Sequence, residues 1–327
     1  MAGCREVASS AAGAEEVIAT SGAGLGGSDD HPERRRAARP GPDVEVDQLP
    51  VLPGVVVRLM SLSPLSERFF EEVLSISSDD PGLALRVIRS ANSPVSAPRS
   101  PVDTLEGAIA RLGANHVTDL VTTVAVARVF IPRTPGETDL WLHAVEVATA
   151  CRAMVEHQRL DGVTAGHAYI AGLLHDIGRL VLFDQSPQFI RAVDDLAWRT
   201  PGELIEAERQ VCGIDHAELG GRVCAHWDVP ERIQAVVHDH HRPLAETPED
   251  ARPLLGVVKL ADWLSIWHRG HADTDDMTET LSQVLPDITA TSAPRKLSDV
   301  ASELARLLPE MAAARTRAVH DLGLMAS

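Results

Sequence analysis

Apolar residues recur at intervals of three and four positions along most of the chain after about residue 47. This spacing puts the apolar side chains on one face and predicts amphipathic α-helices. The stretch "DDPGLALRVIRSAN" also has Asp80 in an N-cap position, with Pro81 at the first helical residue. No pair of segments alternates as two neighbouring strands would, and no repeat of fixed period is present. The fold class is therefore predicted to be all-α.

Two further segments carry both a start signal and a stop signal for a helix. "DTLEGAIARLG" offers Asp103 as N-cap and Glu106 as its partner in a capping box, and Gly113 is expected to end the helix. "TPGELIEAERQVCG" begins with Thr200 as N-cap and ends at Gly213. These signals predict short, well-delimited helices.

Breaks in the helical pattern predict the organisation of the chain. The first residues are rich in Ala, Gly, Ser, Glu and Arg without periodicity, which is typical of a disordered tail. Pro and Gly gather in "IPRTPGET", where we expect a boundary between two lobes. The predicted parts are a tail (1–46), a first helical lobe (47–132), a second lobe (137–270) and a C-terminal helical extension (271–327).

Composition and charge narrow the functional classes. Only 3% of the residues are aromatic, which favours close-packed aliphatic helices. The net charge of −17 argues against binding to the nucleic-acid backbone. The chain has no apolar run long enough for a bilayer and no apolar leader after its first charges, so we expect no membrane association and a cytoplasmic location. The cysteines show no CxxC spacing and are expected to be free, buried thiols: Cys4, Cys151, Cys212 and Cys224.

Histidines and aspartates in apolar surroundings form the candidate chemistry. Five predicted helices each offer a ligand type, and Asp139 precedes the first histidine by four residues, on the same helix face. Imidazoles and carboxylates together suit Mn, Fe, Co, Ni or Zn. A buried aspartate is costly unless it is paired or binds metal. The candidate ligands are Asp139, His143, His175, Asp176, His216, His240, His241 and Asp262.

Each of these residues also has an ordinary structural interpretation. Asp176 could cap a helix or accept a hydrogen bond from one histidine. Asp262 could pair with Arg252 or Lys259. A single histidine on a helix is typical of core or surface packing. The order of the whole set along the chain favours a shared metal.

That order, H, HD, H, HH, D, is similar to the HD superfamily of metal-dependent phosphohydrolases. The resemblance is closest to the HDOD branch, the HD-related output domain of bacterial signalling proteins, and covers about residues 47–270. The first lobe contributes "LPVLPGVVVRLMSL", "DDPGLALRVIRSANSP" and "TLEGAIARLGANHVTDLV". The second contributes "LWLHAVEVA", "AGLLHDIGRLVL" and "HAELGGRVCAHWDVP".

The resemblance implies a two-lobed helical domain related to the HD-GYP cyclic-dinucleotide phosphodiesterases. It places the eight candidate ligands around one or two divalent transition metal ions, with Asp139 where those enzymes add a glutamate. Two departures stand against that activity. The first is that no GYP triplet follows His241. The second is that Arg179 stands where the enzymes have the lysine of "HDIGK", so a planar guanidinium group replaces a compact ammonium group.

Two functions therefore remain open at this stage. The resemblance favours a bacterial signalling module that binds a partner protein or a small signalling ligand. The alternative is a phosphohydrolase acting on a cyclic dinucleotide or nucleotide. In that case Asp176 would bridge two ions that activate water, and Arg179 would hold the phosphate oxygens. The segment after about residue 275 could cap the bundle, dock a partner or support a homo-oligomer.

Overall fold

The computed structural model describes residues 49, 52–62, 66–96, 100–158, 162–198, 200–270, 277–288 and 297–322. All of them belong to one unit, Arg39–Ser327, and the predicted tail 1–46 lies outside the described residues. The described residues form α-helices and short 3-10 turns, and no strand, which confirms the all-α prediction. None of these helices combines the length and apolar composition of a membrane span.

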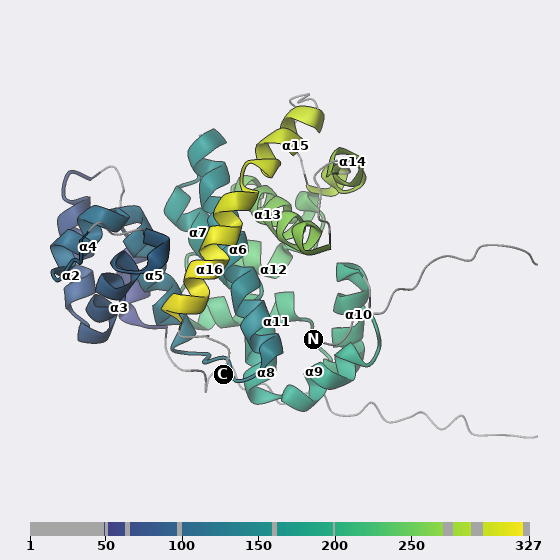
Figure 1. The fold of residues 1–327 in the computed structure, drawn as a ribbon. Helices are drawn as coiled ribbons and strands as arrows, with labels where there is room; N and C mark the ends of the chain where they lie inside the picture. Colours follow the sequence, from purple (N-terminus) through teal and green to yellow (C-terminus); the bar gives the residue numbers. More distant parts are fainter. Residues whose placement is uncertain are drawn as a thin grey trace, which may run out of the picture. The chain divides into compact units, whose positions relative to one another are not determined.

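The helices up to α5 form a first group (Figure 1), and their buried side chains make a separate hydrophobic cluster. Val73, Val87 and Ile109 are fully or almost fully buried in it. Helix α5 forms despite its many β-branched residues, because nearly all of its side chains from Val117 onward are buried by packing. The helices are α1 (Gly54–Met60), α2 (Phe69–Ser78), α3 (Pro81–Ala91), α4 (Leu105–Leu112) and α5 (Ala114–Ala127).

Capping residues fix several helix ends, with one correction. The Asp80 side chain accepts hydrogen bonds from the first backbone N–H groups of α3, as predicted. The N-cap of α4 is Thr104 and not Asp103, because the Thr104 hydroxyl accepts the bond from the Gly107 N–H at 3.1 Å. Gly213 ends its helix in the left-handed region, at φ 75°, as its stop signal predicted.

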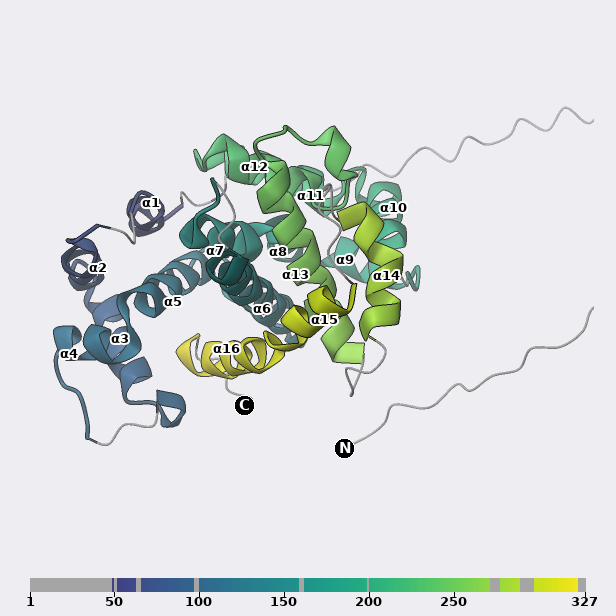
Figure 2. The same cartoon turned by 90° about the horizontal axis from the view of Figure 1, so that it is seen from above.

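The second group of helices surrounds the long helix α6. Helices α7, α13 and α16 all pack against α6, which therefore lies at the centre of this part of the fold (Figures 1 and 2). Trp141 of α6 is fully buried and donates a hydrogen bond to the Phe130 carbonyl oxygen. The helices are α6 (Pro135–Gln158), α7 (Ala165–Leu174), α8 (Ile177–Gln185), α9 (Pro187–Asp194), α10 (Pro201–Cys212), α11 (His216–His226), α12 (Glu231–Asp239) and α13 (Arg252–Gly270).

The segment "AGLLHDIGRLVL" is not one continuous helix. Helix α7 ends at Leu174 and α8 begins at Ile177, so that His175 and Asp176 occupy the corner between them. Helix α8 packs against α11, and Gly178 makes this contact close. A Cβ atom on Gly178 would lie 2.0 Å from the carbonyl oxygen of His216. The corner therefore faces the start of α11.

Three helices follow α13 in the described part of the C-terminal segment: α14 (Met277–Ile288), α15 (Leu297–Ala305) and α16 (Leu308–Asp321). Helix α16 contains Pro309 in its first turn. It packs along α6 and also contacts α3 (Figure 2). Arg86 of α3 donates a hydrogen bond to the carbonyl oxygen of Asp321. The last helix therefore contacts both groups of helices.

The cysteine prediction is confirmed where the structure describes it. Cys151, Cys212 and Cys224 are buried and free. Burial raises the pKa of Cys212 to about 11, so that this thiol stays protonated at neutral pH. Cys4 lies outside the described residues.

Candidate metal centre

Five parts of the fold place ligand-type side chains at one point. Helix α6 supplies one histidine, the α7–α8 corner supplies a histidine and an aspartate, and the start of α11 supplies another histidine. The end of α12 adds two adjacent histidines, and α13 adds an aspartate. The residues are His143, His175, Asp176, His216, His240, His241 and Asp262, all of them buried or partly buried.

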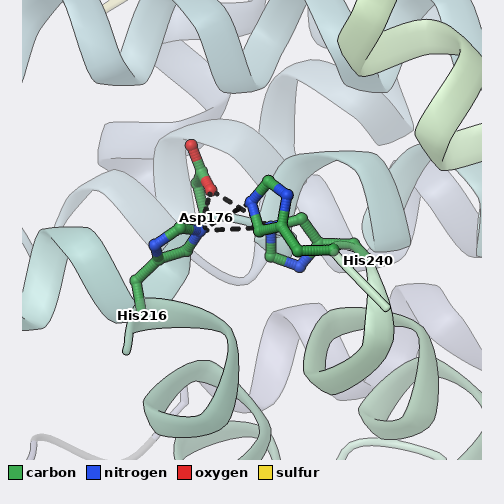
Figure 3. A group of neighbouring side chains, drawn as sticks. Asp176, His216 and His240 are labelled. Atoms are coloured by element: carbon green, nitrogen blue, oxygen red, sulfur yellow. Dashed lines mark hydrogen bonds and ion pairs between the residues drawn. The ribbon is translucent and has the colours of Figure 1, made fainter. Parts of the chain in front are cut away.

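Asp176 lies between two sets of histidines. Its Oδ1 atom is 3.2 Å from Nε2 of His216 and 3.5 Å from Nε2 of His240. Its Oδ2 atom is 3.6 Å from Nε2 of His175 and 3.9 Å from Nε2 of His143. Figure 3 shows the carboxylate beside the rings of His216 and His240. One carboxylate is therefore shared by two potential ligand sets.

Each set is compact enough to hold a metal ion. The ligand atoms of His143, His175 and Asp176 lie within 4.8 Å of one another, and the same limit holds for Asp176 with His216, His240 and His241. Asp262 adds a carboxylate to the first set, with Oδ1 3.1 Å from Nε2 of His143 and 3.8 Å from Nε2 of His175.

The Nδ1 atoms of four of the five histidines have partners outside the centre, which leaves their Nε2 atoms facing it. The Nδ1 atom of His175 lies 2.8 Å from the Gly172 carbonyl oxygen, and that of His240 lies 2.7 Å from the Val237 carbonyl oxygen. A carbonyl oxygen only accepts, so both Nδ1 atoms carry a proton. In the neutral tautomer Nε2 then offers a lone pair, as metal ligation requires.

The buried Nε2 atom of His175 makes no hydrogen bond within the described structure. Burying a polar atom without a hydrogen-bond partner costs folding free energy unless a ligand or ion binds that atom. Together with the imidazole and carboxylate donors around it, this orphan atom fits a transition metal ion.

The carboxylates of the centre are held in the ionised form. Burial alone would raise the pKa of Asp176, but His175, His216 and His240 hold the pKa of that carboxyl well below its usual range. Burial likewise opposes ionisation of Asp262, and the hydrogen bond and charge of His143 nonetheless lower its pKa. Both side chains are thus ready to bind a cation.

The surroundings shift the pKa values of two histidines of the centre in opposite directions. Burial lowers the pKa of His241 to about 2. Burial also disfavours the charged form of His216, but the carboxylates of Glu208 and Asp176 overcome it and raise its pKa to about 10. A metal ion at His216 must displace this proton.

The chain matches the HDOD domain family model over residues 49–243. It belongs to the HDOD domain family. An HDOD domain protein of unknown function from Geobacter sulfurreducens has a similar structure, with 25% identity and a TM-score of 0.64, covering 82% of this chain and 92% of that one. A Shewanella amazonensis SB2B protein, provisionally named a phosphohydrolase, shares the fold at 24% identity and a TM-score of 0.63, covering 83% and 96%.

A Treponema pallidum (strain Nichols) protein without a characterised function is 22% identical over 226 residues. The match covers 66% of this chain and 42% of the length of that relative. The family match thus agrees with the resemblance drawn from the sequence and with the all-α structure of the described residues.

One predicted ligand of the HDOD domain does not join the others. The Asp139 side chain is 63% exposed, and its Oδ1 atom lies 3.1 Å from Nη2 of Arg315 in α16. The predicted one-turn relation to His143 holds, since both lie on α6. The carboxylate nevertheless turns to an arginine that follows it by 176 positions, which local spacing cannot predict.

Of the structural alternatives for the two buried aspartates, the hydrogen bond between Asp176 and a histidine fits the 3.2 Å distance to Nε2 of His216, and the capping role of Asp176 is not seen. Asp176 occupies the N-cap position of α8, but its side chain makes no capping hydrogen bond. Arg252 donates to the carbonyl oxygens of Thr247 and Ala245. Asp262 instead faces His143 and His175, with Oδ1 3.1 Å and 3.8 Å from their Nε2 atoms.

Sequence reasoning missed Glu208. Its side chain is fully buried, accepts a hydrogen bond from the His216 backbone N–H at 2.9 Å, and lies 2.6 Å from Nδ1 of His216. The only signal was a glutamate on an otherwise apolar helix face, eight residues before a candidate ligand. Sequence reasoning also missed Ser265 and Glu146. The Ser265 hydroxyl contacts Nδ1 of His143 and donates a hydrogen bond to Glu146.

A cavity of about 410 Å³ opens beside the centre. Arg179 lines it, and its guanidinium carbon lies 5.7 Å from the centroid of the Trp198 ring. The Nε atom of Arg179 is 3.6 Å from Oε1 of Glu208. Arg269 also lines the cavity, together with the ligand-type residues Asp176, His216 and His241. The cavity therefore combines two cations with the candidate metal ligands.

Proposed function

We propose that this HDOD domain binds two divalent transition metal ions and hydrolyses a phosphate ester in the adjacent cavity. The observation that carries the proposal is the position of Asp176, whose two oxygens face different histidine sets. A shared carboxylate is the arrangement expected of a two-metal site.

The chain offers one set of ligands for each ion. His143, His175 and Asp262 would hold the first, and His216, His240 and His241 the second, with Asp176 between them. Ions held there would supply Lewis acidity, which would lower the pKa of water and neutralise phosphate charge. The metal is one of Fe, Mn, Zn, Co or Ni on the chemistry of the donors.

In this proposal Arg179 would bind the phosphate. Its guanidinium group lines the cavity, and Trp198 and Glu208 hold the side chain in place. A planar guanidinium can donate two parallel hydrogen bonds to phosphate oxygens. It would orient the ester and stabilise the charge that develops on it.

The size of the cavity supports a small substrate. About 410 Å³ lies within the range of small-molecule sites. Arg179 and Arg269 line the cavity beside four aspartates, so the positive charge that an anionic substrate needs would come from these arginines together with the metal ions. We therefore propose a nucleotide or cyclic dinucleotide as the substrate class.

A hydrolysis assay tests this function. The metal-loaded full chain is incubated with a chromogenic phosphodiester and with a panel of cyclic dinucleotides, beside Asp176→Asn. We expect turnover by the wild type and its loss in Asp176→Asn. Asp195→Asn, an exposed position in the same part of the chain, serves as the matched control and keeps the activity. Equal turnover in the wild type and Asp176→Asn would overturn the proposal.

A regulatory module is the second candidate. The sequence lacks a GYP triplet, which favours binding over turnover. In that case the metal centre would hold a small phosphate ligand and pass a signal to a partner protein in the cytoplasm. Equilibrium dialysis distinguishes the two, because a module returns its bound ligand intact and an enzyme returns product.

A further inference from the structure

A buried serine hydroxyl lies between His143 and a second carboxylate. Ser265 of α13 is 1% exposed, and its Oγ atom lies 3.0 Å from Nδ1 of His143. The same oxygen is 2.8 Å from Oε2 of Glu146, and Nη2 of Arg269 lies 3.3 Å from it. Three polar groups thus meet one hydroxyl.

The hydrogen-bonding capacity of these groups allows one arrangement. A hydroxyl has one proton to donate and two lone pairs that accept. The Glu146 carboxylate only accepts and the Arg269 guanidinium only donates, so Ser265 gives its proton to Glu146. It must therefore accept from His143, whose Nδ1 carries the proton. The Nε2 atom of His143 remains as the ligand atom and faces Asp262 at 3.1 Å.

The C-terminal helix holds the carboxylate on which this arrangement depends. Glu146 is 4% exposed, and a buried carboxylate requires charged partners. Arg315 of α16 places Nη1 3.3 Å from Oε1 of Glu146 and Nη2 3.1 Å from Oδ1 of Asp139. Arg269 approaches the other oxygen of Glu146, at 3.7 Å. Each Glu146 oxygen therefore faces one guanidinium group.

We propose that Arg315 is a positioning residue of the metal centre, acting on His143 through Glu146 and Ser265. Helix α16 packs along α6 (Figures 1 and 2), and α6 carries both Glu146 and His143. Arg315 of α16 reaches Glu146 across this contact. The inference rests on the proposed two-metal function. The new element is that the C-terminal extension contributes to metal affinity through Arg315. Displacing α16 should therefore weaken metal binding.

The test measures metal affinity rather than turnover. The metal-free full chain is titrated with Zn²⁺ against a chromophoric chelator, and the visible spectrum of bound Co²⁺ reports on the coordination geometry. The variants are Ser265→Ala, Glu146→Gln, Arg315→Ala and Arg315→Lys. Removing partners of this kind lowers metal affinity by about 10- to 100-fold. We expect that loss in Ser265→Ala and Arg315→Ala, with an altered Co²⁺ spectrum.

The conservative variants distinguish an effect on the position of His143 from an effect on the stability of the fold. Arg315→Lys keeps the charge but loses the fork, so it should restore part of the affinity lost in Arg315→Ala. In Glu146→Gln the amide can donate to Ser265, which lets the hydroxyl turn toward His143 and should weaken binding. Arg306→Ala removes an exposed arginine just before α16 and serves as the charge-matched control, with unchanged affinity.

The outcomes distinguish this inference from the function on which it rests. If the folded wild type takes up no metal, both fall. If the wild type binds Zn²⁺ and Ser265→Ala and Arg315→Ala bind within twofold of it, only the role of Arg315 is overturned. If Arg315→Ala lowers the folded fraction, the Zn²⁺ affinities of Arg315→Lys and Ser265→Ala decide whether Arg315 positions His143.

Discussion

The fully buried carboxylate of Glu208 lies 2.6 Å from Nδ1 of His216 and also accepts a hydrogen bond from the His216 backbone N–H. Glu208 thereby fixes both the ring and the main chain at the start of α11. The contact directs Nε2 of His216 toward Asp176, at 3.2 Å. A histidine that binds metal through one ring nitrogen usually donates its other ring N–H to a carboxylate or a carbonyl oxygen.

Glu208→Gln should therefore weaken metal binding while the chain stays folded. The glutamine keeps an oxygen that can accept from His216, but it loses the charge that supports the imidazole. We expect a fall in affinity of about 10- to 100-fold, measured by chelator competition. Glu206→Gln, an exposed position on the same helix, is the control. Equal affinities in the two variants would show that Glu208 plays no part in the site.

Gly178→Ala should disturb the centre through the backbone. The added Cβ would lie 2.0 Å from the His216 carbonyl oxygen and 2.8 Å from the Gly220 nitrogen, so α8 and α11 must separate. Overpacking of this kind costs about 1–3 kcal/mol of unfolding free energy. Denaturant unfolding measures this loss. In Gly166→Ala the new methyl group meets nothing within 4 Å, and the stability should be unchanged or slightly higher.

Arg179→Gln should separate metal binding from chemistry. Arg179 lines the cavity without being a ligand-type residue, so the metal content should equal that of the wild type. Losing a charged donor to the phosphate should lower kcat on the order of 10²- to 10³-fold. Arg191→Gln changes an exposed arginine on α9 and should keep the rate. Loss of metal from Arg179→Gln would contradict this division of roles.

Asp80→Asn should reveal a pH-dependent contribution to folding. The hydrogen bond from Arg128 lowers the pKa of Asp80 below its ordinary value of 3.8. The charged form is favoured in the folded state, so the stabilisation is present above pH 3.8 and is lost as the pH falls through the lower folded-state pKa. Asparagine still caps the helix but cannot carry the charge.

Both groups in this pair are partly exposed, so the contribution should be below about 1 kcal/mol. The measurement is the difference in unfolding free energy between the wild type and Asp80→Asn, first at pH 6 and then near pH 3. The difference should shrink at the lower pH. A difference that grows on acidification would reverse the assigned shift.

Local signals in the sequence were sufficient for most helix ends. Asp80, Thr200 and Gly213 act through bonds or dihedral angles within a few residues, so their roles could be predicted. The choice between Asp103 and Thr104 could not, because both are good N-cap residues one position apart. The break at His175 and Asp176 also escaped prediction, since the flanking residues are apolar on both sides.

The sequence was sufficient to predict which ligand-type residues meet at the candidate site, but not which residues hold their side chains in position. Seven histidines and aspartates from the sequence do meet in the structure. The residues behind them depend on contacts between distant segments: Ser265 reaches Glu146 across 119 positions, and Arg315 reaches it across 169. Asp139 was assigned by its distance from His143 along the helix, and its arginine partner lies far outside that pattern.

The metal content of the folded chain tests the central claim most directly. The wild type and Asp176→Ala are loaded with Mn, Fe, Co, Ni or Zn, freed of excess metal and analysed by elemental mass spectrometry. The shared position of Asp176 predicts about two ions per wild-type chain and a clear loss in Asp176→Ala. A folded wild type that retains none of these metals, or an Asp176→Ala variant that retains as much as the wild type, would contradict the account.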